Sequence, residues 1–221
     1  MIESLFISLQ LALTTSCMLL LLAMPLAYVL AFKSFRGRTV LEVLIALPLV
    51  LPPTVLGYYV LLLIAPHSLL GTAWAGVFDS SLAFSFSGMV LASLLYSLPF
   101  AVQPMQQAFA SIPQRWMELG QVQGLSVWQV FRRIVLPASK GGILVAAVLS
   151  FAHTMGEFGV VLMVGGSIPD ETKVASIALF ELVEMQQQTE AAQLALTLLA
   201  LSFVMLSLVY HINRKPWLGQ A

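Results

Sequence analysis

Hydrophobic residues are concentrated in five long runs, which short polar stretches separate. The runs extend approximately over residues 5–32, 40–65, 86–109, 142–164 and 191–211. Crossing about 30 Å of hydrocarbon takes about 20 helical residues, so each run is long enough to span a membrane. None has the apolar–polar alternation of a β-barrel strand, and helices are then the structure that satisfies the backbone in lipid. The pattern predicts an all-α polytopic membrane protein with about five transmembrane helices.

The basic residues indicate how these helices are oriented. Nine of the ten lie in segments that follow the first, third and fifth runs: Lys33, Arg36, Arg38, Arg115, Arg132, Arg133, Lys140, Arg214 and Lys215. Only Lys173 falls on the opposite side. Short loops rich in Lys and Arg stay in the cytoplasm. We therefore expect an outside N-terminus and a cytoplasmic C-terminus.

Composition supports lipid as the solvent of this chain. Hydrophobic residues make up 59% and charged residues only 9% of the 221 positions, far from the balance of soluble domains. One cysteine, Cys17, excludes an internal disulfide framework or a cysteine-cluster metal site. The first run is too long for a cleaved signal and should remain as a span. We expect one helical domain over residues 1–221 in contact with membrane lipid, without cofactor, metal or nucleic acid.

The segment 167–190 between the last two runs is ambiguous. Its apolar residues are Val174, Ile177, Ala178, Phe180, Leu182 and Val183, and its tail is polar. The apolar stretch is short for a span. We expect an amphipathic helix that lies on the outer surface or dips into the mouth of the bundle, rather than a sixth span.

Prolines interrupt several of the predicted spans. Pro25 lies in the first and Pro99 and Pro104 in the third, while the second contains Pro48, Pro52 and Pro53 followed by Thr54. Each proline removes an intrahelical hydrogen bond. Two interpretations remain open: simple kinks that help the bundle pack, or bends that line a translocation pathway, where broken helix is tolerated in membranes.

The polar loop 110–138 predicts two short helices joined by a turn. Ser111 is a candidate cap for the first, with Pro113 in its first turn and Gly124 as a left-handed stop. Ser126 and Gln129 have the spacing of a capping box for the second, which Pro137 should end. Exposed Trp116, Leu119 and Val122 would make the first helix a docking surface; a connector packed on its own bundle would explain the caps equally well.

The spacing within this loop resembles a known motif. Glu118, Gly124, Ile134, Leu136 and Pro137 lie in register with the Glu-Ala-Ala-x3-Gly-x9-Ile-x-Leu-Pro (EAA) motif of ABC importer permeases. Leu119 and Gly120 stand where that motif has two alanines. Residues 47–57, 150–159 and 163–169 resemble the molybdate permeases within this family, and sulfate permeases share the Gly-Glu-Phe/Tyr-Gly pattern. Ser167 stands where Asn is common.

The resemblance implies a type I ABC importer permease fold in the bacterial inner membrane. It further implies a homodimer, two cytoplasmic ATPase subunits and a periplasmic molybdate-binding protein that delivers the oxyanion. The helix around Glu118 would couple to the ATPase, through a segment comprising Arg115, Trp116, Glu118, Leu119, Gly120, Gly124, Leu125, Ile134, Leu136 and Pro137. The chain has no phosphate-binding Gly-x4-Gly-Lys loop, so we expect no ATP hydrolysis by it.

Other functions remain open at this point. Sulfate, thiosulfate or tungstate permeases share the same build. An intramembrane enzyme would need catalytic partners at membrane depth, and His153 with Glu157 is the one candidate pair, without a nucleophile. An assembly factor without transport activity would not need the EAA spacing.

His153 and Glu157 are four residues apart on one helical face, and ionisable residues inside a membrane usually serve a function. Three roles are open for Glu157: a structural or gating contact, direct substrate contact, or a protonated carboxyl. We group both residues with Gly156, Gly159, Pro48, Pro52, Pro53 and Thr54 as candidate pathway or gate residues. Ser93, Tyr96, Ser97 and Gln103 could line the same conduit.

Overall fold

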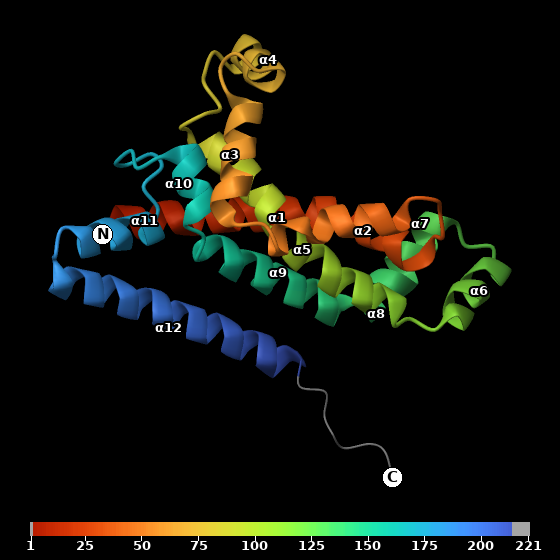
Figure 1. Ribbon diagram of the computed structural model, residues 1–221. Coiled ribbons are helices and arrows are strands. Elements are labelled where there is room, and N and C mark those ends of the chain that lie inside the picture. The colour runs from red at the N-terminus through yellow and green to blue at the C-terminus, as the bar shows by residue number, and fades with distance from the viewer. Residues whose placement is uncertain (1, 214–221) are drawn as a thin grey trace.

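The computed structural model describes residues 2–213, and this part of the chain is helical without a strand (Figure 1). Arg214 and Lys215, which contribute to the predicted orientation, lie outside the described residues. Three long elements form the centre of the bundle: α1 (Ile2–Phe32), α5 (Phe86–Ala110) and α9 (Lys140–Met155). The all-α fold predicted from the hydrophobic runs is confirmed.

Small residues let these three helices approach closely. Ala23 and Ala27 of α1, Ala101 of α5 and Ala146 of α9 are fully buried in one hydrophobic cluster. Lipid tails are as apolar as leucine, so helices associate in a membrane through close packing rather than through apolar area alone. These three helices therefore form the closely packed centre of the bundle.

The second hydrophobic run does not form one straight span. It is divided into α2 (Arg38–Ala46), a 3-10 turn η1 (Leu47–Leu49) and α3 (Pro53–Ile64), and the helix axis bends by 111° between the two arms. Pro48, Pro52 and Pro53 lie at the break, where each removes a backbone donor. Among residues 2–213, three helices are long and apolar enough to span a membrane alone, and the number reaches five only if each bent pair counts as one span.

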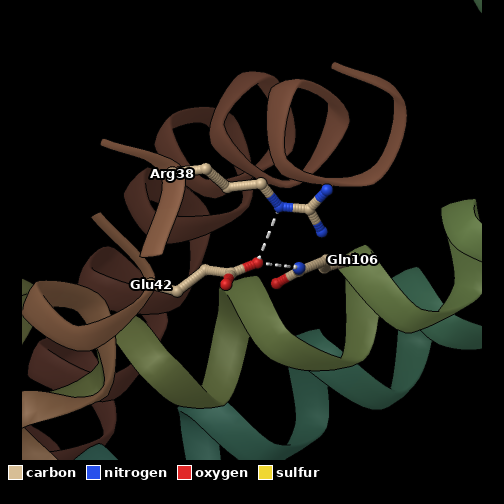
Figure 2. A network of polar contacts seen from close by, with 3 residues as sticks. All are labelled: Arg38, Glu42 and Gln106. Carbon is tan, nitrogen blue, oxygen red and sulfur yellow. Dashed lines mark hydrogen bonds and ion pairs between the residues drawn. The ribbon is translucent and has the colours of Figure 1, made fainter. Parts of the chain in front are cut away.

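A polar network holds α2 against α5 (Figure 2). Arg38 Nε and Gln106 Nε2 each donate a hydrogen bond of 3.1 Å to Glu42 Oε1. Glu42 and Gln106 belong to helices that are distant in sequence, so this contact fixes the first arm of the broken span to the centre.

The fourth hydrophobic run is also interrupted. Helix α9 ends at Met155, residues 156–158 are not helical, and α10 (Gly159–Gly165) continues the chain. The predicted span over residues 142–164 is therefore two helices, because Gly156 favours a helix end and the next turn forms tertiary contacts instead. A second bend of 73° separates Val127–Ala138 from α9.

The remaining helices lie on different sides of the bundle (Figure 1). Helix α4 (Leu69–Phe78), which the hydrophobic pattern did not predict, begins at Ser68, whose hydroxyl accepts the Gly71 N–H at 2.9 Å. Segment 167–190 contains α11 (Ala175–Glu184), which is too short to span a membrane. Helix α12 (Gln188–Asn213) follows, and only 11% of the residues in its apolar stretch are buried.

Candidate functional site

The loop between α5 and α9 folds into α6 (Gln114–Val122), α7 (Val127–Val130), a π-helical turn η2 (Phe131–Val135) and α8 (Leu136–Ala138). Gly124 has φ +73°, the left-handed conformation expected of it. The capping box of Ser126 and Gln129 is present in both directions. These local signals in the sequence predicted the turn between the two helices correctly.

Two predictions for this loop are wrong. Ser111 does not cap α6: its hydroxyl donates to the Ala108 carbonyl at 2.8 Å, so it closes the end of α5, and α6 begins at Gln114. Pro137 does not end the second helix, which continues through α8 to Ala138. Proline is tolerated there because it lies in the first turn of α8, after the wider π turn has already displaced the hydrogen-bond ladder.

One face of α6 packs on the second part of the loop through Gly120. A Cβ at this position would lie 3.0 Å from both Ile134 Cδ1 and Val130 Cγ2. The Leu125 N–H also donates to the Gly120 carbonyl at 3.0 Å. The small residue in the second alanine position of the EAA motif is thus needed for contact between the two halves of the loop.

The opposite face of α6 is exposed. Arg115, Trp116, Glu118 and Leu119 are all exposed, and Leu119 is 58% exposed. Glu118 accepts a hydrogen bond from Gln114 Nε2 at 3.0 Å within the helix. A shallow groove beside this face is lined by Trp116, Leu119, Gly120, Gln123, Arg133, Ile134, Pro137 and Ala138. The coupling residues therefore divide into an outward set and an inward set, the latter comprising Gly120, Leu125, Ile134 and Leu136.

The break between α2 and α3 lies beside the break between α9 and α10, and both are far from the loop that contains α6 (Figure 1). A Cβ on Gly159, the first residue of α10, would lie 2.8 Å from Pro53 Cβ, the first residue of α3. One Cβ on Gly57 would lie 2.8 Å from Met163 Cβ. The two short helices therefore pack as closely as glycine permits, along their shared length.

A cavity lies beside this contact. It is lined by Pro53, Thr54, Tyr96, Ala152, His153, Gly156, Glu157, Phe158 and Gly159. Six of the eight candidate pathway residues are thus brought together: Pro53, Thr54, His153, Gly156, Glu157 and Gly159. Pro48 and Pro52 do not line it, because Pro48 is buried in η1 and Pro52 is the exposed residue before α3. Of the four further candidates, Tyr96 lines it, whereas Ser93, Ser97 and Gln103 do not.

Glu157 is held from two neighbouring helices. Ser93 Oγ of α5 donates to Glu157 Oε2 at 2.8 Å, and Ser176 Oγ of α11 donates to the Glu157 carbonyl at 2.5 Å. The residue is 4% exposed, and Oε1 has no hydrogen-bond partner among the described residues. Glu157 therefore ties the α9–α10 break to both α5 and α11.

His153 is fixed by a serine and two aromatic rings. Ser97 Oγ lies 2.8 Å from His153 Nδ1 and 3.0 Å from Thr154 Oγ1. The imidazole stacks on Phe100 with 4.0 Å between the centroids, and Tyr96 lies on another side at 4.8 Å. Spacing could have identified Phe100, which is four residues after Tyr96 on α5; nothing in the sequence singled out Ser176.

Beyond α10, the turn before α11 carries an ion pair. Buried Thr172 Oγ1 donates to the Gly165 carbonyl at 2.7 Å and accepts from the Ile168 N–H at 3.1 Å, which fixes the turn. Lys173 forms a salt bridge with Glu181, to which the Ser167 hydroxyl also donates. The Lys173 ammonium and then the Ser167 hydroxyl hold the pKa of Glu181 below its ordinary value.

This arrangement can be compared with known proteins. The family described as "Binding-protein-dependent transport system inner membrane component" matches residues 23–217. The chain belongs to this family. Among its relatives, the molybdenum transport system permease protein ModB of Azotobacter vinelandii is 41% identical over 208 residues, covering 94% of this chain and 92% of the relative. ModB of Haemophilus influenzae is 32% identical, over 97% and 94%.

More distant relatives extend the comparison. The sulfate transport system permease protein CysT of Escherichia coli K12 is 30% identical, covering 82% of this permease chain and 65% of CysT. A crystal structure of a bacterial alginate ABC transporter with its periplasmic protein superposes with a TM-score of 0.76 at 17% identity, covering 100% of this chain and 80% of the other. The fold is that of ABC importer permeases, and these relatives are transport subunits.

Proposed function

We propose that this permease is the membrane subunit of an ATP-driven importer for molybdate. The main support is the full-length similarity to two molybdenum permeases, together with the separation of the chain into an exposed helical loop and a distant cavity between broken helices. A translocating subunit needs both: one surface that receives work from an ATPase and one place where the substrate passes.

The outward face of α6 is the surface we assign to the ATPase. Trp116 and Leu119 offer an apolar centre, while Arg115 and Glu118 flank it with opposite charges. Exposed aromatic and arginine side chains on a small element are typical of docking surfaces. The Gly120 contact transmits movement of α6 to η2 and α8, and α8 leads directly into α9.

The cavity at the helix breaks is the passage we assign to the oxyanion. None of its described lining residues is Lys or Arg. Thr54 and Tyr96 hydroxyls form no hydrogen bond with other described residues, and His153 has one ring nitrogen engaged by Ser97. Neutral donors bind an oxyanion without holding it as tightly as cations do. Weak binding suits a passage, and selection would rest with a binding protein.

In the assembled importer, two copies of the chain would face each other, with two ATPases on the cytoplasmic side and a periplasmic molybdate-binding protein outside. Closure of the ATPase pair would move both α6 helices and change access to the cavity. The basic residues of the described loops favour a cytoplasmic position for α6. A periplasmic reporter fused before Glu3 should be active, and one after Lys215 should be inactive; equal activity would contradict this orientation.

A measurement of uptake would identify the substrate. Proteoliposomes with the permease, its ATPase and its binding protein should accumulate molybdate, with ATP consumed. At equal concentration, sulfate, thiosulfate and tungstate should each inhibit this uptake less than unlabelled molybdate does. Preferential sulfate uptake would assign the chain to the sulfate permeases, to which CysT also relates it. No ATP-dependent uptake of any oxyanion would refute the importer function itself.

A further inference from the structure

An apolar groove between α1 and α7 meets a basic pocket at Trp128. Arg133 of this pocket also lines the groove beside α6. The apolar groove is lined almost entirely by carbon, from Leu21, Met24, Pro25 and Tyr28 of α1 to Trp128 and Phe131. The adjoining pocket is lined by Trp128, Gln129, Arg132 and Arg133. A single ring therefore separates an apolar region from a cationic one.

The aromatic residues give this groove a defined wall. Trp128 stacks on Phe131 with 5.6 Å between centroids, and Tyr28 meets Phe131 edge-on at 5.5 Å. Leu21 and Trp128 are 75% and 65% exposed, so the groove opens outward from the bundle. Tryptophan at the edge of a membrane span is typical of the level of the lipid head groups.

The groove is long enough to hold part of a lipid chain. Helix α1 ends at Phe32, and with a rise of 1.5 Å per residue the stretch from Tyr28 to Leu21 extends about 10 Å into the membrane. The Tyr28 end of the groove lies near the helix terminus, and Lys33 and Arg36 follow it in sequence. An elongated apolar group could lie along this wall with its polar end beside Trp128.

Both arginines lie away from the carboxylates of residues 2–213. Neither Arg132 nor Arg133 forms an ion pair with another described residue, and no acidic side chain lines their pocket. Guanidinium groups bind phosphate in a two-pronged geometry. Basic pockets beside transmembrane helices bind the head groups of anionic lipids.

We infer that this site binds an anionic glycerophospholipid, with an acyl chain along α1 and its phosphate between Arg132 and Arg133. Both arginines lie in the turn η2, which follows α7 and contacts α6 through Ile134. A bound lipid would thus steady the second half of the coupling loop from the membrane side.

Titration of phosphatidylglycerol into the delipidated, full-length permease with its accompanying subunits tests this inference, with native mass spectrometry counting bound lipid. One phosphatidylglycerol per chain should bind more tightly than phosphatidylcholine. Arg132→Gln and Arg133→Gln should each weaken that binding about fivefold. Arg36→Gln, an exposed arginine at the same end of α1 outside the site, should leave it unchanged.

The Leu21→Trp variant tests the apolar groove independently of the two arginines. It adds a ring over the outer edge of the groove and leaves both arginines in place, so it should weaken phosphatidylglycerol binding without affecting recovery of the ATPase. Unchanged binding in the double variant Arg132→Gln/Arg133→Gln, or in Leu21→Trp, would overturn the inference. Loss of the ATPase with lipid binding intact would likewise overturn it and assign the arginines to the subunit contact.

Discussion

The coupling loop and the cavity at the helix breaks both interrupt helices, but different forces hold the two interruptions. In the loop, Gly124 and the Ser126–Gln129 capping box form the turn from neighbouring residues. At the cavity, Gly159 packs on Pro53, and Ser93 and Ser176 bind Glu157 from other helices. A local interruption can be exposed and move with a partner, whereas an interruption in lipid needs the surrounding protein to satisfy it.

The largest expected effect comes from the local turn. Gly124→Val combined with Glu118→Ala should abolish uptake and recovery of the ATPase, because a β-branched residue at φ +73° costs at least about 1 kcal/mol and misdirects α6. Membrane insertion should be normal, since the turn lies outside the bundle. Uptake, co-purification and membrane yield are the measurements.

Gly76→Val is the matched control for this variant. Gly76 lies in α4 with ordinary backbone angles, and a Cβ there would meet no atom within 4 Å, so the same substitution should leave uptake and ATPase recovery unchanged. Full transport by the Gly124→Val/Glu118→Ala permease would show that the loop does not couple to the ATPase.

At the helix breaks, adding a single methyl group should impair uptake without releasing the ATPase. Gly159→Ala places a Cβ 2.8 Å from Pro53 Cβ and must push α3 and α10 apart, at a cost of about 1–3 kcal/mol. Uptake should fall severalfold while the ATPase still co-purifies and hydrolyses ATP. Gly141→Ala, whose Cβ would meet no atom within 4 Å, serves as the control. If Gly159→Ala lost ATPase recovery together with uptake, the helix breaks and the coupling loop would not have separate roles.

Two substitutions of Glu157 separate the effect of its charge from the effect of its hydrogen bond with Ser93. Glu157→Gln keeps the hydrogen bond from Ser93, so uptake should largely persist over a pH series. Glu157→Leu leaves Ser93 unsatisfied in a buried site, which costs about 1–3 kcal/mol, and should impair uptake. Glu184→Gln, an exposed position on α11, is the control.

A Gln variant that assembles normally but transports no better than the Leu variant would place the charge itself in the mechanism. The same holds if Glu157→Gln changes the pH dependence of uptake. In either case the structural or gating role that we favour for Glu157 would be wrong.

The smallest expected effect concerns the ion pair of Lys173 and Glu181. Because the pKa of Glu181 is lowered in the folded state, its contribution to stability is present above the ordinary glutamate pKa and is lost as pH falls through the lowered value. Both side chains are partly exposed, so the contribution should not exceed about 1 kcal/mol.

Thermal unfolding measures this contribution. The purified wild type should unfold at a slightly higher temperature than Glu181→Gln at neutral pH, and the difference should vanish in acid. Glu190→Gln, which has no ion-pair partner among residues 2–213, should unfold like the wild type. A difference that persists or grows in acid would contradict the assignment.

The sequence predicted what short-range chemistry determines. Hydrophobic runs located the helical regions, and the spacing from Glu118 to Pro137 located the loop with its turn at Gly124. The same reasoning failed where tertiary contacts decide: the run over residues 40–65 divides at Pro52, and Ser111 closes α5 instead of opening α6. It grouped His153 and Glu157 by spacing, but only the fold brings Thr54, from a distant run, beside them.

The break between α2 and α3 bears on how the protein enters the membrane. Helix α3 has 12 residues, or about 18 Å of helix, against about 30 Å of hydrocarbon. Helix α12, long and largely exposed, can partition into lipid on its own during synthesis. The segment with the prolines cannot, because α3 is short and packs against α10 through Gly57 and Gly159, and α10 is made much later. Its stable insertion should therefore wait for the later helix, so that biogenesis of this chain is not a simple sequence of spans.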